Sequence, residues 1–131
     1  MIGLDTNVLV RYVAQDDAKQ SLQATRLIEA LTVEAPGFIS AVTVAELVWV
    51  LTGCYGSTKT EICAVLEALL RTKELVVDQA ETVWKALKMF RGSGGDFADC
   101  LIERSGSVVG CEHTVTFDKG AARNCGMHLV G

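Results

Sequence analysis

The chain has 131 residues, of which 50% are hydrophobic and 21% are charged, and its formal net charge is −4. This length and apolar content predict a single domain, residues 1–131, and exclude a disordered chain. No apolar run approaches the roughly 20 residues that a membrane span needs, and no secretory signal precedes the first motif, so we expect a cytoplasmic protein that does not enter membranes. The acidic balance argues against a nucleic-acid partner, unless several acids bind divalent cations.

Short apolar runs alternate with segments of helical periodicity along the whole chain. The predicted strands are residues 2–4, 38–40, 74–78, 112–116 and 127–130. The predicted helices are residues 6–13, 18–32, 41–54, 57–71, 79–90 and 96–105, with a short one after Asp118. Strands that alternate with helices in this way predict a mostly parallel sheet covered on both faces. We therefore expect a three-layer α/β/α fold.

Two carboxylates follow predicted strands directly. Asp5 ends the apolar run 2–4, and Asp118 comes just after Val115 and Thr116. Ligands of open α/β sheets bind outside the carboxyl ends of the strands, near the point where the strand order reverses. If the first and fourth strands are neighbours, both acids lie at the same edge of the sheet.

Three further acids lie on predicted helices. Glu46 interrupts the apolar helix 41–54, and a carboxylate is seldom buried unless it is paired or bound to a metal. Its place in the second turn of a helix that follows a strand predicts that Glu46 points over the sheet edge where Asp5 and Asp118 are expected. Asp96 and Asp99 share one side of the helix 96–105. Asp96 fits an N-cap, whereas Asp99 lies further in, where capping does not account for it.

Converging carboxylates repel one another unless they hold a hard cation. Oxygen ligands suit Mg²⁺ or Mn²⁺, and such sites typically hydrolyse phosphodiesters because the metal activates water and stabilises the leaving oxygen. A suitably placed histidine base is absent, which fits a nucleophile generated by a metal. For any one acid alone, a surface position or a helix cap is an equally good interpretation.

Four motifs together resemble a PIN domain. They are Ile2-Gly3-Leu4-Asp5-Thr6-Asn7-Val8-Leu9, Thr43-Val44-Ala45-Glu46-Leu47, Asp96-Phe97-Ala98-Asp99-Cys100-Leu101-Ile102 and Thr116-Phe117-Asp118-Lys119. More narrowly, the chain looks like the VapC-type toxins of bacterial and archaeal toxin–antitoxin pairs. The likeness covers nearly the whole chain, with the motifs in the family's order and approximate spacing.

The resemblance implies an endoribonuclease that depends on Mg²⁺ or Mn²⁺ and has a five-stranded Rossmann-like sheet of order 3-2-1-4-5. It also implies a homodimer, inhibited by a cognate antitoxin that usually binds operator DNA. The catalytic and metal-binding acids implied by matching position are Asp5, Glu46, Asp99 and Asp118. Polar residues that would help to hold water, metal or phosphate are Thr6, Asn7 and Thr116. The resemblance leaves Asp96 as an outer-shell residue, which does not ligate the metal itself.

Three alternatives differ in the residues that they require. A phosphoacceptor receiver would use Asp78 and Lys119, but it needs an acidic pair after the first strand and leaves the helical acids unexplained. A haloacid-dehalogenase-like phosphatase with Asp5 as nucleophile needs a second aspartate where this chain has Asn7. A PIN-like module that only binds RNA or protein stays open, although the retention of all four acids argues against it.

The cysteines and the surface charges are less informative. Five cysteines without a CxxC motif argue against a disulfide framework. The zinc-ligand types Cys111, His113, Cys125 and His128 fall in or beside predicted strands, so we interpret them as structural. Candidate phosphate contacts, for which solvated surface charge is the simpler interpretation, are Arg11, Arg91, Lys119 and Arg123. Trp49 and Tyr55 suit a dimer or antitoxin surface, and core packing explains Trp49 equally well.

Overall fold

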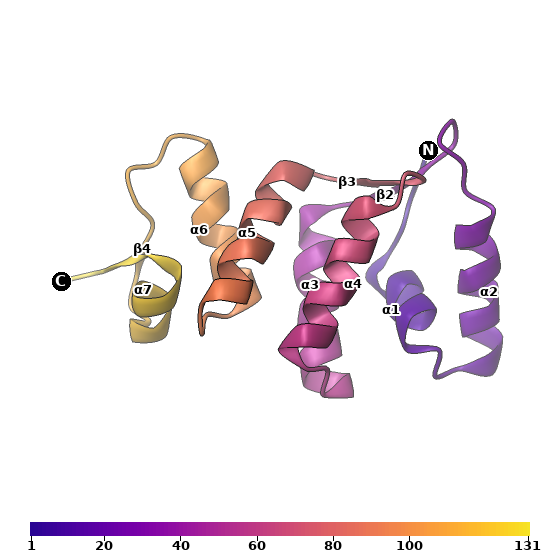
Figure 1. Cartoon of the computed structure of the whole chain (residues 1–131), viewed down its shortest axis with the longest axis horizontal. Helices are drawn as coiled ribbons and strands as arrows, with labels where there is room; N and C mark the ends of the chain where they lie inside the picture. The colour runs from indigo at the N-terminus through magenta and orange to yellow at the C-terminus, as the bar shows by residue number, and fades with distance from the viewer. The chain divides into compact units, whose positions relative to one another are not determined.

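The computed structural model describes the whole chain, Met1–Gly131, as two compact units. The N-terminal unit comprises Met1–Ala80 and the C-terminal unit comprises Glu81–Gly131. The chain forms seven helices and five short strands, which confirms the predicted α/β class. Figure 1 shows the helices along the course of the chain. None of these helices combines the length and the hydrophobicity that crossing a bilayer requires.

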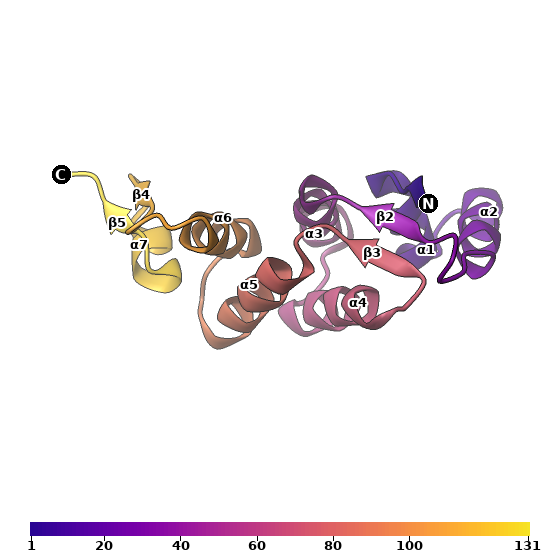
Figure 2. The same ribbon diagram turned by 90° about the horizontal axis from the view of Figure 1, so that it is seen from above.

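The N-terminal unit contains a three-stranded parallel sheet. Its strands are β1 (Ile2–Gly3), β2 (Gly37–Ile39) and β3 (Leu75–Val77), with β2 in the centre. Figure 2 shows β2 and β3 side by side. A side chain at Gly37 would meet the side chains of Leu4 and Leu31 at 2.9 Å, so only glycine allows this close approach.

Four helices surround this sheet: α1 (Thr6–Ala14), α2 (Ala18–Glu29), α3 (Ala41–Tyr55) and α4 (Lys59–Arg71). The first packs against α2 and α3, and α4 packs against α3 and β3. Their fully buried side chains include Leu9, Val44, Leu47, Ile62 and Leu66. A capping box with Thr58 as the N-cap and Glu61 as its partner begins α4, two residues later than the predicted start at residue 57.

The C-terminal unit contains α5 (Ala80–Gly92), α6 (Phe97–Val108), α7 (Lys119–Cys125) and a parallel pair of strands. The strands are β4 (Val115–Thr116) and β5 (His128–Leu129). The rings of Phe90 and Phe97 meet edge to face with their centroids 5.7 Å apart, and this contact ties α5 to α6. The imidazoles of His113 and His128 stack with centroids 4.2 Å apart.

The five predicted strands thus form two sheets, in which the predicted neighbours 3-2-1 and 4-5 are hydrogen-bonded. Each strand is only two or three residues long. The fourth was predicted as residues 112–116, but only Val115 and Thr116 have a partner strand. Likewise α2 ends at Glu29 rather than at residue 32, because Ala30 and Leu31 continue only as a turn whose amides donate to Leu27 and Ile28.

Candidate functional site

Asp5 stands at the end of β1 and at the start of α1. Its backbone is extended (φ −76°, ψ 158°), and its carbonyl oxygen accepts hydrogen bonds from the amides of Val8 and Leu9. Its carboxylate, however, makes no capping hydrogen bond and is exposed. The helix therefore uses the backbone of Asp5 and leaves the carboxylate oxygens for another partner. The amino end of a helix also favours a negative charge at this place.

Glu46 is joined to the same corner by Thr6. The Thr6 side chain is buried, and its hydroxyl donates a hydrogen bond to Oε1 of Glu46. α3 begins where β2 ends, with Ser40 as its N-cap, and this places Glu46 in the second turn of the helix. The N-terminal unit therefore brings Glu46 against the residue that follows Asp5.

The expectation that Glu46 is a buried carboxylate is wrong, because its side chain is exposed. The buried residues of α3 are Val44, Leu47, Val48 and Leu51. Trp49 is 72% exposed on the same helix, which also excludes the interpretation of Trp49 as a core residue. The helix is apolar nearly all round, so its composition does not show which face the core covers.

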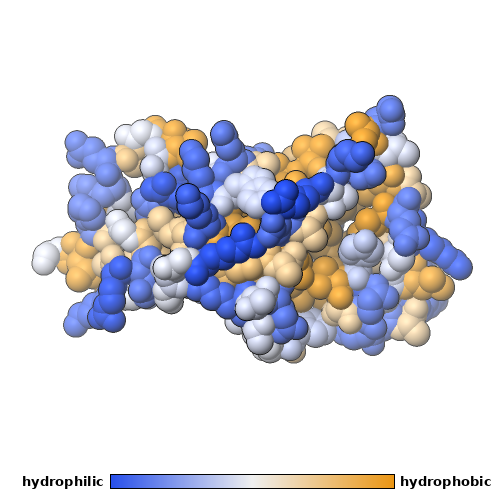
Figure 3. Space-filling view, in the orientation of Figure 1, coloured by the Kyte–Doolittle hydropathy of each residue, from blue (hydrophilic) through white to orange (hydrophobic).

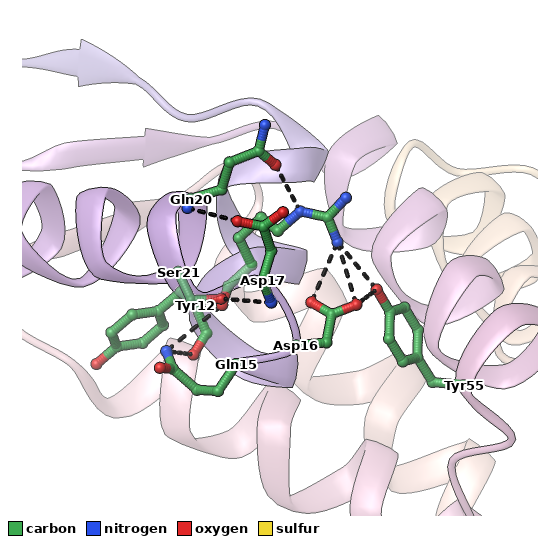
Figure 4. Close-up of polar contacts among 8 residues, drawn as sticks. Tyr12, Gln15, Asp16, Asp17, Gln20, Ser21 and Tyr55 are labelled. Atoms are coloured by element: carbon green, nitrogen blue, oxygen red, sulfur yellow. Dashed lines mark hydrogen bonds and ion pairs between the residues drawn. The ribbon is translucent and has the colours of Figure 1, made fainter.

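Asn7 faces away from the core of the unit. It lines a hollow between α1 and α2, together with Val8, Arg11, Gln20, Gln23, Ala24 and Leu27. Figure 4 shows the polar contacts beside this hollow, where Gln20, Asp16 and Tyr55 converge on the guanidinium of Arg11. The Arg11 charge is therefore offset by Asp16, which makes Arg11 a poor phosphate contact.

The same contacts hold the end of α3 to the turn between α1 and α2. The Tyr55 hydroxyl donates to Oδ2 of Asp16 at 2.6 Å, and this hydrogen bond is the main reason why the pKa of Asp16 is lowered. Nη1 of Arg11 lies 3.1 Å from the Tyr55 oxygen. The Tyr55 hydroxyl therefore ties the end of α3 to the turn between α1 and α2, while its ring stays 38% exposed.

In the C-terminal unit, Asp96 is the N-cap of α6. Its Oδ1 accepts hydrogen bonds from the amides of Ala98 at 2.7 Å and Asp99 at 3.3 Å, so the capping interpretation is confirmed. Asp99 is the third residue of the helix and is partly buried. Burial raises the pKa of Asp99, and the charges of Asp96 and Asp118 raise it further. These three acids therefore influence one another.

Asp118 follows β4 and is the N-cap of α7. Its Oδ1 accepts from the amide of Ala121 at 3.0 Å, and its own amide donates to the hydroxyl of Thr116 at 3.0 Å. Thr116 therefore shapes the turn that carries Asp118. A side chain at Gly120 would lie 3.0 Å from the same Oδ1, so glycine keeps space beside the carboxylate.

Two buried thiols lie next to the acidic residues. Sγ of Cys100 and Sγ of Cys125 are 3.6 Å apart, and both residues are buried free cysteines. Burial, and then the hydrogen bond with Cys125, raise the pKa of Cys100 to about 12. A side chain at Gly95 would approach Sγ of Cys125 to 2.6 Å, so the residue before Asp96 must be small.

The sequence interpretation did not identify Gly95 or Gly120 as part of the site. The available signal is that each glycine lies within two residues of a predicted acid. A Cβ at Gly120 would meet the Asp118 carboxylate, and one at Gly95 would meet the Cys125 sulfur. The link from Thr6 to Glu46 was not foreseen either, because it joins residues 40 positions apart.

Each unit thus gathers part of the predicted set. The N-terminal unit holds Asp5, Thr6 and Glu46 near one another, and the C-terminal unit holds Asp96, Asp99 and Asp118. No group of three or more His, Cys, Asp or Glu side chains is arranged to hold a metal ion. The donors are nevertheless all oxygen. Burial, and then the charges of Asp96 and Asp118, raise the pKa of Asp99, and a hard divalent cation would offset both costs of its ionised form. The chemistry of these residues fits Mg²⁺ or Mn²⁺.

Comparison with known proteins gives one family. The PIN domain model matches residues 2–126, and the match includes all four acidic motifs. No curated protein matches the chain. PIN domains are typically nucleases, and they generally use divalent metals. Because the match spans nearly the whole sequence, the chain belongs to the PIN domain family.

Proposed function

We propose that this chain is an endoribonuclease that hydrolyses RNA phosphodiester bonds with Mg²⁺ or Mn²⁺ as its cofactor. The observation that carries the proposal is the state of two acids that helix capping does not explain. The carboxylate of Asp5 makes no capping bond although it stands at an N-cap, and the pKa of Asp99 is raised by burial and by neighbouring acids. Both states suit carboxylates whose partner is a cation.

In this proposal Asp5, Glu46, Asp99 and Asp118 hold the metal. When bound, the cation lowers the pKa of water and stabilises the charge that develops on the phosphoryl and leaving oxygens. Two of these acids, Asp5 and Asp118, follow a strand directly, and open α/β sheets bind their ligands at this kind of position.

The supporting residues have narrower tasks. Thr6 orients Glu46 through its hydroxyl, and Thr116 fixes the turn before Asp118. Asp96 caps α6 and adds negative charge near Asp99. Asn7 is exposed beside Asp5, where its amide suits water or a phosphate oxygen.

We further propose that the protein is the toxin of a toxin–antitoxin pair, acting in the cytoplasm as a homodimer that a cognate antitoxin inhibits. The support is the likeness to VapC-type toxins in the four motifs, together with the exposed apolar side chains of Val42 and Trp49 on α3. Large exposed apolar side chains are typical of surfaces that bind another protein. An adjacent gene for a small DNA-binding protein that forms a complex with this chain would support the assignment.

The nuclease proposal is tested by cleavage of a structured RNA. The wild-type protein should cleave it with Mg²⁺ or Mn²⁺ and should stop when EDTA is added. Asp5→Asn and Asp99→Asn should each lower the rate at least about 100-fold, because a metal ligand supplies several kcal/mol of transition-state stabilisation.

A matched control is Asp17→Asn. Asp17 is also an aspartate at a helix N-cap, with its carboxylate on the amide of Gln20 at 2.8 Å, but it lies outside the four motifs. The control should cleave as the wild type does. Equal cleavage by Asp5→Asn and Asp17→Asn would overturn the proposal. RNA binding without any metal-dependent cleavage would favour the alternative, a PIN-like binding module.

A further inference from the structure

Two cysteines of the C-terminal unit lie in contact with each other inside the protein. Cys100 belongs to α6 and Cys125 is the last residue of α7, and their Sγ atoms are 3.6 Å apart. Figure 3 shows a surface of mixed hydrophilic and hydrophobic residues over this unit, and both cysteines lie beneath it, with 0% of either residue exposed. The proposed function uses neither thiol.

The packing of α6 against α7 explains why the two sulfurs meet. The buried residues of α6 are Phe97, Cys100 and Leu101, and those of α7 are Ala121 and Cys125. The two helices contact each other, so each cysteine occupies a core position of its own helix and touches the other helix. The fold therefore holds together two thiols that lie 25 positions apart in the sequence.

A short glycine-rich loop lies against both sulfurs and reaches the surface. Residues 92–95, Gly-Ser-Gly-Gly, lead from the end of α5 towards α6. The Ser93 hydroxyl donates a hydrogen bond to Sγ of Cys100, and a Cβ at Gly95 would lie 2.6 Å from Sγ of Cys125. Gly94, between them, is exposed. Because glycine-rich backbone opens more readily than a helix, movement of this loop gives a small reagent access to both thiols.

We propose that Cys100 and Cys125 are an oxidation-sensitive pair, which forms a disulfide when the protein meets a peroxide. The S–S bond of a disulfide is about 2.05 Å long, so the sulfurs must approach by roughly 1.5 Å from their present contact. The other three cysteines are placed differently, since Cys54 and Cys111 are exposed and Cys63 is buried in the N-terminal unit. The disulfide therefore forms within the C-terminal unit.

The oxidation takes two steps. One thiol sulfur takes an oxygen atom from hydrogen peroxide and becomes a sulfenic acid, and one water is released. The second thiol sulfur then attacks it, so that the S–S bond forms, the S–O bond breaks and a second water leaves with the remaining thiol hydrogen. The two electrons that the thiols lose reduce the peroxide, and a dithiol such as dithiothreitol reverses the reaction by exchange. Burial makes the oxidation slow, because it must await opening of the loop.

The disulfide acts on the acids that the same two helices carry. Asp99 immediately precedes Cys100 in α6, and Asp118 is the N-cap of α7. Because both cysteines are packed in the core, part of the approach of the sulfurs must come from the helices themselves. A displacement of about 1 Å at a reacting centre can lower a rate 10²-fold, so oxidation should slow RNA cleavage. This consequence rests on the proposed function, whereas the disulfide rests on the contact of the sulfurs.

Peptide mapping of the wild-type protein tests the disulfide, and it needs no variant. The native protein is treated with hydrogen peroxide, denatured, alkylated at its remaining thiols and digested without reductant. Peptides linked through Cys100 and Cys125 should appear, while Cys63, a buried cysteine of α4, should be alkylated in full. The proposal is overturned if Cys100 and Cys125 are both alkylated under conditions that oxidise Cys111, or if Cys100 is linked to any other cysteine.

RNA cleavage tests the consequence in the Cys54→Ser/Cys111→Ser protein, which lacks the exposed thiols. Peroxide should lower its rate at least about tenfold, and dithiothreitol should restore it. In the matched control, which carries Cys125→Ala in addition, peroxide should leave the rate unchanged. Circular dichroism checks that the control is folded. Unchanged cleavage by a protein in which mapping finds the linked pair would show that the disulfide is not a switch.

The two proposals fail separately. A reduced protein that does not cleave RNA rejects the nuclease, and peptide mapping alone then decides on the disulfide. A protein that cleaves RNA while Cys100 and Cys125 stay unlinked rejects the disulfide and leaves the nuclease standing.

Discussion

The two units use aspartates at the same kind of position in different ways. Asp5 and Asp118 each follow a strand and stand at the N-cap of the next helix. The Asp118 carboxylate caps α7 through the amide of Ala121, whereas the Asp5 carboxylate makes no capping bond. The N-terminal unit thus supplies a carboxylate, that of Asp5, whose oxygens make no capping hydrogen bond. The C-terminal unit supplies a cluster of three acids, Asp96, Asp99 and Asp118. Position after a strand therefore does not by itself tell a cap from a ligand.

The largest expected effect concerns two thiols of the C-terminal unit, Cys100 and Cys111. Cys54 and Cys111 are exposed, while Cys100 and Cys125 are buried beside the acidic cluster. With the pKa of Cys100 raised to about 12, its thiolate is scarce at pH 8. In native protein at pH 8, Cys100 should react with iodoacetamide at least about 1000-fold more slowly than Cys111. Peptide mapping measures both rates, and equal rates would show that Cys100 is accessible to the reagent and not buried.

In the N-terminal unit, the position of the Glu46 carboxylate depends on the hydrogen bond from Thr6. Thr6→Val keeps the shape of the side chain and removes the hydroxyl that donates to Glu46, so RNA cleavage should fall roughly 10- to 100-fold, as when the support of a metal ligand is lost. Thr6→Ser keeps the donor and should retain most of the activity. If valine and serine give the same rate, Thr6 does not position Glu46.

Stability measurements without metal separate capping from non-capping aspartates. Asp96→Ala removes the carboxylate that accepts from two amides of α6 and should cost about 1 kcal/mol, or about 4 °C in Tm. Asp5→Ala should cost less than about 0.5 kcal/mol, because no side-chain capping bond is lost. Thermal melts in EDTA measure both. Equal losses would remove the distinction between the units.

The smallest expected effect is the pH dependence of the stability that Asp99 contributes to the folded protein. Its pKa is raised in the folded protein by burial and by the charges of Asp96 and Asp118, so folding favours the neutral carboxyl over the ionised one. Its favourable contribution is present below the unfolded pKa of about 3.9 and is lost as the pH rises through the raised folded value. In EDTA, Asp99→Asn should therefore gain in Tm relative to the wild type as the pH rises towards 7. An unchanged difference across this range would argue against the crowding of charge.

Much of the fold follows from periodicity and turn residues. All seven helices and five strands were predicted, and the strand neighbours 3-2-1 and 4-5 are present. The N-cap at Asp96 was also predicted correctly, because a short polar side chain before a helical run has few other local uses.

Other features depend on contacts that no local pattern encodes. The exposure of Glu46 and Trp49 depends on which face of an all-apolar helix the core covers. The ion pair of Arg11 with Asp16 is local, but the hydrogen bond of Arg11 to Tyr55 joins residues 44 positions apart. Both contacts engage a side chain that the sequence offered as a phosphate contact. The space beside Asp118 at Gly120 likewise becomes visible only in three dimensions.

The central proposal is that Asp5 and Asp99 are metal ligands, and a calorimetric titration with Mn²⁺ tests it most directly. Three proteins are compared with the wild type: Asp5→Asn, Asp99→Asn and the control Asp17→Asn. Each of the first two should weaken Mn²⁺ binding at least about tenfold, because each removes a charged oxygen ligand, and the control should bind as the wild type does. Wild-type affinity in Asp5→Asn or in Asp99→Asn would contradict the proposal.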